Sequence, residues 1–515
     1  MLKPFIKTKN IELVNQAVGG SAWNLIASII QRIGGFIFTV ILARFLLPES
    51  FGLYNLTISI ATIFFMFCQN GINATLRRYF SEVLNYHDKD KESGYFQYLL
   101  KIKLFVLFIA LIILLIFAYP VSTIIFKNKS IFIPLLLAGC YMFIISLEQF
   151  FTAFFFSIGK VKYIAFKETI GQASRILIVL LMFLIIYSNP TIIATFISLI
   201  LSIFVTLSFV IYKTYSISPY LFAKFTDINK TDKKRIINFS LYLTFASISL
   251  VFFGSTDILM LGWLVKDTSY VGFYSSAFVL ISSLSGLLTF AHVLLPVFVK
   301  TGKDNLEKVF NKTFRYSIIL SMPASFGFII LADYIINLIY GQNYAPAVFP
   351  LYFLSFLVVL SIQTGLFTEL FSAEEKPKYY FKLLIGVIIL NLVLNYILIK
   401  YLSIYSLVAS ITGAAIATLI SWVVYSICLG ILTKKKLGIK TNLIVCIKPL
   451  ISSLVMVGLI LLLKNSFKDI TLLNGVILVI SGIIVYFVSL FLIKGINKED
   501  YILIELIKSK FNKRV

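Results

Sequence analysis

The stretch Val14–Leu46, VNQAVGGSAWNLIASIIQRIGGFIFTVILARFL, decides the fold because it is a long apolar run with Arg32 near its middle. At about 1.5 Å per residue, a helix of this length crosses the hydrocarbon core of a membrane, which is about 30 Å thick. An arginine at that depth costs about 3 kcal/mol on insertion scales. Arg32 is therefore expected to face a protein interior or a wet cavity.

The polar residues of this stretch share one face of the expected helix. They recur at steps of three and four residues and are Asn24, Ser28, Gln31, Arg32, Gly35 and Thr39. Leu, Ile, Phe and Val occupy the opposite face, so the helix is amphipathic. This pattern predicts lipid on one side of the helix and, on the other, a polar cavity built by the rest of the chain.

The composition is that of a membrane protein with many crossings. Of the 515 residues, 59% are hydrophobic and only 13% are charged, whereas soluble domains have about 45–50% apolar and about 25% charged residues. No cleavable signal peptide is expected, because the first apolar run is too long and lacks a small-residue cleavage site. The net charge of +24 does not predict a nucleic-acid partner, because the basic residues lie in short loops between apolar runs.

Fourteen apolar runs are expected to cross the membrane as helices. They cover residues 14–46, 52–76, 99–121, 131–158, 163–187, 190–212, 236–264, 271–298, 314–339, 346–371, 380–400, 403–432, 443–463 and 471–493. With a cytoplasmic N-terminus, 37 of the 46 Lys and Arg residues lie on the inside and 7 on the outside, while Arg32 and Arg175 lie within the membrane. This bias predicts a multi-pass protein of the cytoplasmic (inner) membrane with both termini cytoplasmic.

Two short motifs recur in the second half of the chain at nearly one offset. Gly-Leu-Tyr at 52–54 matches Gly-Phe-Tyr at 272–274, and Lys-Val-Lys-Tyr at 160–163 matches Lys-Pro-Lys-Tyr at 376–379. Each match relates a helix to the one six further on, which predicts two parallel six-helix lobes related by a pseudo-two-fold axis along the membrane normal. The expected domains are a first lobe at 1–215, a second lobe at 216–432, and a C-terminal helix pair with a cytoplasmic tail at 433–515.

Three stretches carry a resemblance to a known family: LARFLLPESFGLYN at 42–55 with NGINATLRRYFSEV at 70–83, the loop of Lys160 and Lys162, and LIYGQNYAPA at 338–347. With these stretches the chain resembles the bacterial and archaeal polysaccharide transporters. Those are O-antigen-type flippases for lipid-linked oligosaccharides, within the multidrug/oligosaccharidyl-lipid/polysaccharide exporter superfamily. The resemblance implies an all-α, V-shaped, two-lobed fold that turns an undecaprenyl- or dolichyl-linked glycan across the membrane.

The sequence contains little that indicates an enzyme. It has no G-x-x-x-x-G-K-[ST] loop and no H-E-x-x-H motif, so neither an ATPase nor a zinc site is expected. The four cysteines lie in apolar runs without metal-ligand spacing, and His87 with Asp88-Lys89-Asp90 is interpreted as a solvated loop. We therefore expect a transporter with no catalytic residue, no cofactor and no metal.

The ionisable residues within the membrane are the candidate site. Arg32, Glu148 and Arg175 are interpreted either as a structural Arg–Glu–Arg triad or as a pyrophosphate site, because the triad leaves one buried positive charge unbalanced and Arg binds phosphate bidentately. The candidate substrate-binding residues are Arg32, Arg175, Glu148, Asn24, Ser28, Gln31, Asn70 and Asn73. The candidate ion-coupling residues are Asp257, Glu369 and His292; for His292, a satisfied interior histidine is the alternative.

The leading hypothesis is a monomeric flippase that moves a polyprenyl-pyrophosphate oligosaccharide by alternating access for cell-surface polysaccharide biosynthesis. Its expected partners are the lipid-linked oligosaccharide and membrane lipids, with a polysaccharide polymerase and chain-length proteins as further candidates. One alternative is a cation-coupled multidrug exporter of the same superfamily, for which acidic cavity residues are expected. A membrane glycosyltransferase or ligase is disfavoured, because the outside loops are too short to hold a catalytic domain.

Overall fold

The computed structural model describes residues 3–186, 191–223, 228–289, 298, 303–467 and 471–495, with the backbone alone for 3–19, 21, 70, 186, 246, 303 and 304. Every regular element in these ranges is a helix, which confirms the all-α prediction. Twelve helices in these ranges are long and apolar enough to cross a membrane, or thirteen when a bent pair is counted as one span. The first of the twelve, Ala22–Leu84, covers two of the predicted runs. Counting it as two spans and the bent pair as one gives a number that agrees with the fourteen runs.

The helices follow the predicted order. They are α1 (Lys3–Phe65), α2 (Asn70–Leu84), α3 (Lys89–Pro120), α4 (Phe132–Ser157), α5 (Lys162–Leu181), α6 (Ile192–Ile217), α7 (Lys230–Leu264), α8 (Thr268–Leu288), α10 (Lys303–Ile330), α11 (Ala332–Ile339), α12 (Val348–Leu354), α13 (Leu357–Ala373), α14 (Lys378–Leu402), α15 (Leu407–Leu437), α16 (Ile447–Ser466) and α17 (Leu472–Leu492). Short turns include η1 (Met66–Cys68), η3 (Lys129–Ile131) and η6 (Gln342–Ala347).

Two breaks interrupt the first part of the chain, and the sequence signals only one of them. Leu47, with φ 61° and ψ 170°, kinks α1 directly before Pro48, because proline disfavours the helical conformation of the residue that precedes it. The second break, η1, divides a run that was predicted as one helix, 52–76. There the Cys68 carbonyl accepts hydrogen bonds from the fully buried Lys103 amine of α3 and from Ser146 Oγ of α4, at 3.3 Å.

Close packing divides the chain into two units. Unit 1 comprises 1–283 and 384–418, and unit 2 comprises 284–383 and 419–515. This division follows contacts between helices and does not test the predicted domain limits at 215 and 432, which stay a prediction.

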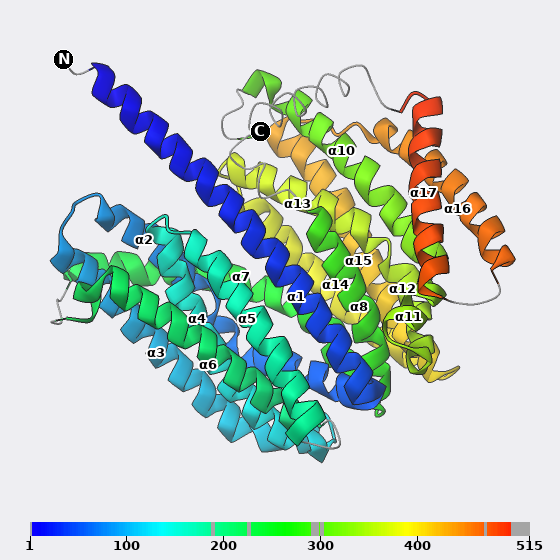
Figure 1. The fold of residues 1–515 in the computed structure, drawn as a ribbon, viewed down its shortest axis with the longest axis horizontal. Helices are drawn as coiled ribbons and strands as arrows, with labels where there is room; N and C mark the ends of the chain where they lie inside the picture. Colours follow the sequence, from blue (N-terminus) through cyan, green and yellow to red (C-terminus); the bar gives the residue numbers. More distant parts are fainter. Residues whose placement is uncertain are drawn as a thin grey trace. The chain divides into compact units, whose positions relative to one another are not determined.

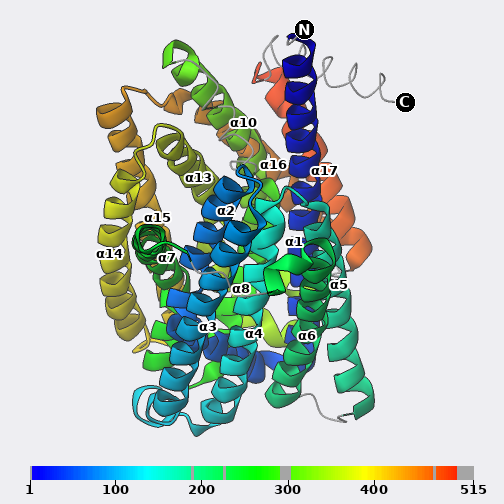
Figure 2. The ribbon, with the colours of Figure 1, turned by 90° about the vertical axis from the view of Figure 1, so that its left-hand side faces the viewer.

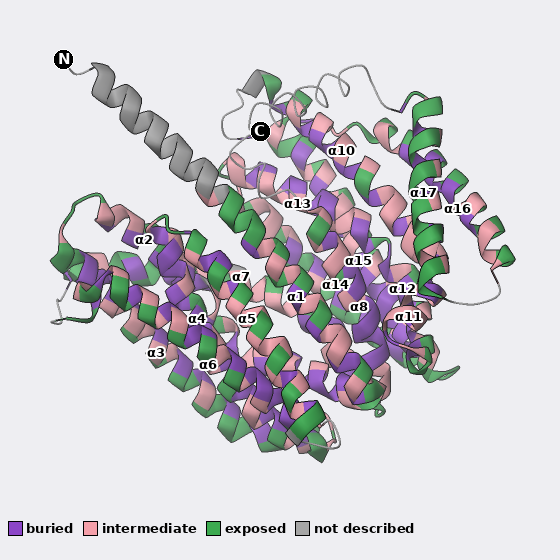
Figure 3. Ribbon diagram, viewed as in Figure 1, coloured by how far each residue is buried: buried purple, intermediate pink, exposed green. Residues whose placement is uncertain are grey.

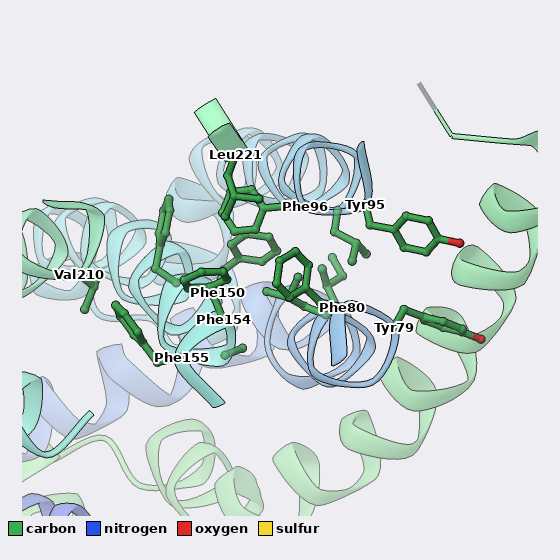
Figure 4. Packing of buried hydrophobic residues seen from close by; sticks show 14 of the residues in the cluster. Tyr79, Phe80, Tyr95, Phe96, Phe150, Phe154, Phe155, Val210 and Leu221 are labelled. Atoms are coloured by element: carbon green, nitrogen blue, oxygen red, sulfur yellow. The ribbon is translucent and has the colours of Figure 1, made fainter. Parts of the chain in front are cut away.

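An aromatic core holds the helices of unit 1 together. Phe80 of α2, Phe96 of α3, and Phe150 and Phe154 of α4 meet between their helices (Figure 4). The ring centroids of Phe80 and Phe154 are 5.4 Å apart, and those of Phe96 and Phe150 are 5.5 Å apart. Edge-to-face and tilted contacts of this kind add to the free energy of burial. This core fixes α4, which carries Glu148 near its middle.

In unit 2, α16 and α17 lie side by side (Figure 1). The Tyr486 hydroxyl of α17 donates to the Ile319 carbonyl of α10 at 2.8 Å, and Lys464 of α16 pairs with Asp333 of α11 at 2.7 Å. Exposed residues run along much of α17 (Figure 3), and Leu473 and Ile480 are among them. An apolar face of this kind is suited to lipid.

The two glycines of the repeated Gly-x-Tyr motif contact each other's helix ends within unit 1. A Cβ atom built on Gly52 would lie 1.9 Å from the Thr268 carbonyl oxygen, and one on Gly272 would lie 2.1 Å from the Pro48 carbonyl oxygen. Each glycine thus meets the residue that lies four positions before the other glycine. This reciprocal contact is what a two-fold relation between the repeats predicts, and it requires residues without a side chain.

Candidate functional site

A polar cavity of about 300 Å³ opens between α1, α4, α5 and α6 of unit 1. These four helices pack against one another (Figure 2). The uncharged polar side chains that line it are Gln31, Gln149, Thr152, Gln172, Ser202 and Thr206. The charged ones are Glu148, Lys167, Glu168 and Arg175.

A three-residue ion pair joins α4 to α5 at this cavity. Lys167 Nζ lies 2.9 Å from Glu148 Oε1 and 2.6 Å from Glu168 Oε1. The three side chains are only 12%, 3% and 11% exposed, and Thr152 Oγ1 donates to Glu148 Oε1 at 3.0 Å. Buried charges are tolerated only with such partners, so Lys167 is what keeps both carboxylates in the interior.

This arrangement corrects the predicted Arg–Glu–Arg triad. Within the described part of the chain, Glu148 pairs with Lys167 and forms no ion pair with Arg32 or Arg175. The positive charge that the triad left unbalanced is matched here, because the cavity contains two cationic and two anionic side chains. The sequence analysis missed Lys167 because it lies only five residues after the start of α5. A lysine there resembles the basic residues that mark the cytoplasmic end of a transmembrane helix.

Arg175 lies on the aromatic side of the cavity. Its guanidinium carbon is 3.7 Å from the centroid of the Phe38 ring of α1, and the group lies beside the Tyr54 hydroxyl. A cation over a ring face is stabilised by the ring quadrupole. Arg175 Nε, however, is buried and has no hydrogen-bond partner, and the same is true of Gln172 Oε1 on the preceding turn.

The predicted substrate residues are only partly brought together. Gln31, Glu148 and Arg175 line the cavity, whereas Arg32, half-buried on α1, does not. Of the remaining candidates, Asn24 is exposed and Ser28 is half-buried. Asn73 is buried, and its Oδ1 lies 3.2 Å from the Lys103 amine. The side chain of Asn70 lies outside the described residues. Arg32 follows Gln31 directly and forms no ion pair in the described structure.

Asp257 of α7 is the centre of a second polar cluster in unit 1. Its carboxylate accepts hydrogen bonds from Tyr274 at 2.5 Å, Thr418 at 2.6 Å and Asn395 at 2.8 Å, which belong to α8, α15 and α14. The Oδ1 atoms of Asn391 and Asn395 are buried nearby without a hydrogen-bond partner. A carboxylate with free amide oxygens is a ligand set that a hard cation prefers.

The sequence identified Asp257 but not the residues around it. Asn391 and Asn395 are four residues apart on one helix face, which is the signal that would have found them. Of the other two ion-coupling candidates, Glu369 is half-buried on α13 in unit 2, and His292 lies outside the described residues.

Comparison with known proteins places these features in context. A family model described as polysaccharide biosynthesis protein matches residues 17–302, more than half of the chain. A probable low-salt glycan biosynthesis flippase of Haloferax volcanii is 25% identical over 256 residues, which are 48% of this chain and 52% of that protein. A probable lipid II flippase of Rickettsia prowazekii is 27% identical over 240 residues, 41% and 45% of the two chains. The chain thus matches about half the length of these curated relatives.

Solved structures agree on the fold. A lipid II flippase in an inward closed conformation superimposes with a TM-score of 0.72 at 16% identity, over 90% of this chain and 97% of that one. An inward-facing multidrug resistance transporter of the multidrug/oligosaccharidyl-lipid/polysaccharide superfamily gives a TM-score of 0.55 at 14% identity, over 81% and 96%. At these identities the likeness establishes a shared fold.

Proposed function

Because the chain belongs to the polysaccharide biosynthesis protein family, we propose that it is a flippase. It would carry a polyprenyl-pyrophosphate-linked oligosaccharide across the cytoplasmic membrane by alternating access, for cell-surface polysaccharide biosynthesis. The observation that carries the proposal is the polar, charge-balanced cavity within a chain whose outer faces are apolar. The multidrug alternative favours more acidic than basic groups, whereas this cavity has two of each.

In this proposal the protein works as a monomer, converts no substrate chemically, and has membrane lipids and the lipid-linked glycan as its partners. Arg32 contacts the pyrophosphate, because it is half-buried beside the cavity residue Gln31 and has no carboxylate partner among the described residues. Arg matches phosphate oxygens with two parallel hydrogen bonds, and a lysine offers only a point charge.

Binding of undecaprenyl pyrophosphate to the purified protein in nanodiscs tests this role. Arg32→Ala is expected to weaken binding about tenfold or more, since a charge-assisted hydrogen bond contributes about 1.5–3 kcal/mol. Arg32→Lys should retain part of the affinity, and Lys129→Ala, at an exposed residue of η3, should bind like the wild type. An Arg32→Ala variant with wild-type affinity would remove Arg32 from the site.

We further propose that Asp257 couples transport to a gradient of sodium or protons. Asp257→Asn replaces one carboxylate oxygen with an amide NH2 group, which donates and cannot accept a hydrogen bond, and it removes the charge that holds a cation. The variant should bind the lipid-linked substrate normally but show no response to an imposed ion gradient in vesicles. Gradient-driven transport that is unchanged in Asp257→Asn, with both gradients tried, contradicts this role.

The proposed topology has both termini in the cytoplasm. In a variant whose four native cysteines are replaced, single cysteines near Lys127 or at Gln342 should react with an impermeant thiol reagent in intact cells. Cysteines near Lys230 or Lys436 should react only after the cells are opened. The opposite labelling pattern requires the reverse orientation.

A further inference from the structure

Two residues that line the cavity, Gln172 and Arg175, each have a buried polar atom without a hydrogen-bond partner. Gln172 Oε1 can only accept a hydrogen bond, Arg175 Nε can only donate one, and neither has a partner. Their residues are three apart on α5, so they lie on one helix face. Leaving buried polar atoms unsatisfied costs free energy, so this pair indicates a ligand that the cavity is built to receive.

The chemistry of the pair restricts that ligand. A group that serves both atoms must donate to Gln172 and accept from Arg175, and a hydroxyl group does both. A phosphate that carries no proton only accepts, and an ammonium group only donates. The neighbouring Gln31, Thr152 and Ser202 offer further amides and hydroxyls, which pair with hydroxyl groups equally well.

The charges of the cavity lead to the same class of ligand. Lys167 is occupied by Glu148 and Glu168 at 2.9 and 2.6 Å, so Arg175 is the one cation of the cavity without a carboxylate partner among the described residues. A pyrophosphate placed here would meet two carboxylates in a site of low dielectric, where repulsion is strong. A neutral polyhydroxylated ligand avoids that cost.

We propose that this cavity is a subsite for a neutral sugar unit, one hydroxyl of which bridges Gln172 Oε1 and Arg175 Nε, while the pyrophosphate lies outside it near Arg32. This inference rests on the proposed flippase function and specifies which part of the substrate the cavity recognises. The position of Gln172 depends on Gly34 of α1, since a Cβ built there would lie 2.5 Å from Gln172 Cγ. Gly34 thus leaves room for the side chain that accepts from the sugar.

The experiment compares two probes in nanodiscs, undecaprenyl pyrophosphate and the same lipid carrying one N-acetylglucosamine. The wild type should bind the sugar-bearing lipid more tightly, and Gln172→Leu should lose about tenfold of that affinity, the size of one hydrogen bond to a buried polar group. Binding of the bare lipid should not change in this variant. Gly34→Ala, which displaces Gln172 but keeps its amide, should show the same selective loss, and Gln342→Leu, at an exposed residue of η6, should show none.

The outcomes separate the two proposals. Equal losses for both lipids, or no advantage of the sugar-bearing lipid in the wild type, overturn the sugar subsite and leave the cavity as a water-filled space. Failure of the wild type to bind either lipid overturns the flippase function instead. Melting temperatures of all variants, measured in the same nanodiscs, identify any loss that comes from misfolding.

Discussion

Replacing Lys167 with methionine is expected to destabilise the protein by about 3–5 kcal/mol, because it leaves the Glu148 and Glu168 carboxylates buried without a cation. Both carboxylates lie within 3 Å of the amine that the substitution removes, and the Glu148 side chain is only 3% exposed. The loss should appear as a lower melting temperature of the purified protein. Lys162→Met provides a matched control, since Lys162 is exposed on the same helix, α5.

A triple variant tests the cause of that loss. Lys167→Met combined with Glu148→Gln and Glu168→Gln leaves no unpaired charge, so most of the stability should return. Two results would contradict the ion-pair assignment. One is a triple variant that is no more stable than Lys167→Met, and the other is a Lys167→Met variant that is as stable as Lys162→Met. The double variant Arg32→Gln/Glu148→Gln should behave differently. Its second substitution should not recover stability that the first one loses, because these two residues form no pair in the structure.

Gly52→Ala is expected to be the second most damaging single change. The added Cβ would meet the Thr268 carbonyl oxygen at 1.9 Å, and neither backbone can move aside as a flexible side chain would. Overpacking of this kind costs about 1–3 kcal/mol, and it should prevent the close contact between α1 beyond its kink and α8. Gly272→Ala should behave alike, since a Cβ there would meet Pro48 in the reciprocal position.

The measurement for this contact is the melting temperature together with transport in vesicles. Gly386→Ala on α14 is the matched control, because a Cβ at that position has no atom of another helix within 4 Å. Gly52→Ala and Gly272→Ala should each lose stability and transport, whereas Gly386→Ala should lose neither. If all three variants behave alike, the two glycines are not required for the contact.

The spans of the helices could be predicted from the sequence, and the break within 52–76 could not. Apolar runs report burial in lipid directly, and the gap between the predicted runs 14–46 and 52–76 contains the kink at Leu47. The break at η1 depends on Lys103 and Ser146, which reach the Cys68 carbonyl from two other helices. A local pattern contains no signal for a hydrogen bond between residues that are 35 and 78 positions apart.

The candidate site was predictable in its charged residues and not in their pairing. We found Glu148, Arg175 and Asp257 because an ionisable group inside an apolar run is costly in free energy and therefore indicates a functional site or a buried partner. Their partners were missed: Lys167 resembles an ordinary cytoplasmic lysine, and the four-residue spacing of Asn391 and Asn395 on α14 was not recognised as a polar face. Only the packing of α4 on α5 and of α7 on α14 and α15 shows which groups meet.

The central claim is that the chain moves a lipid-linked sugar from one leaflet to the other. Its most direct test places the purified protein in vesicles that contain a fluorescent undecaprenyl-pyrophosphate N-acetylglucosamine, with an ion gradient imposed, and follows quenching by an impermeant reductant. Vesicles with the wild-type protein should be quenched almost completely, because inner-leaflet lipid reaches the outer surface, while protein-free and Arg32→Ala vesicles should retain the inner-leaflet signal. The same plateau with and without the wild-type protein, under both sodium and proton gradients, would contradict the account.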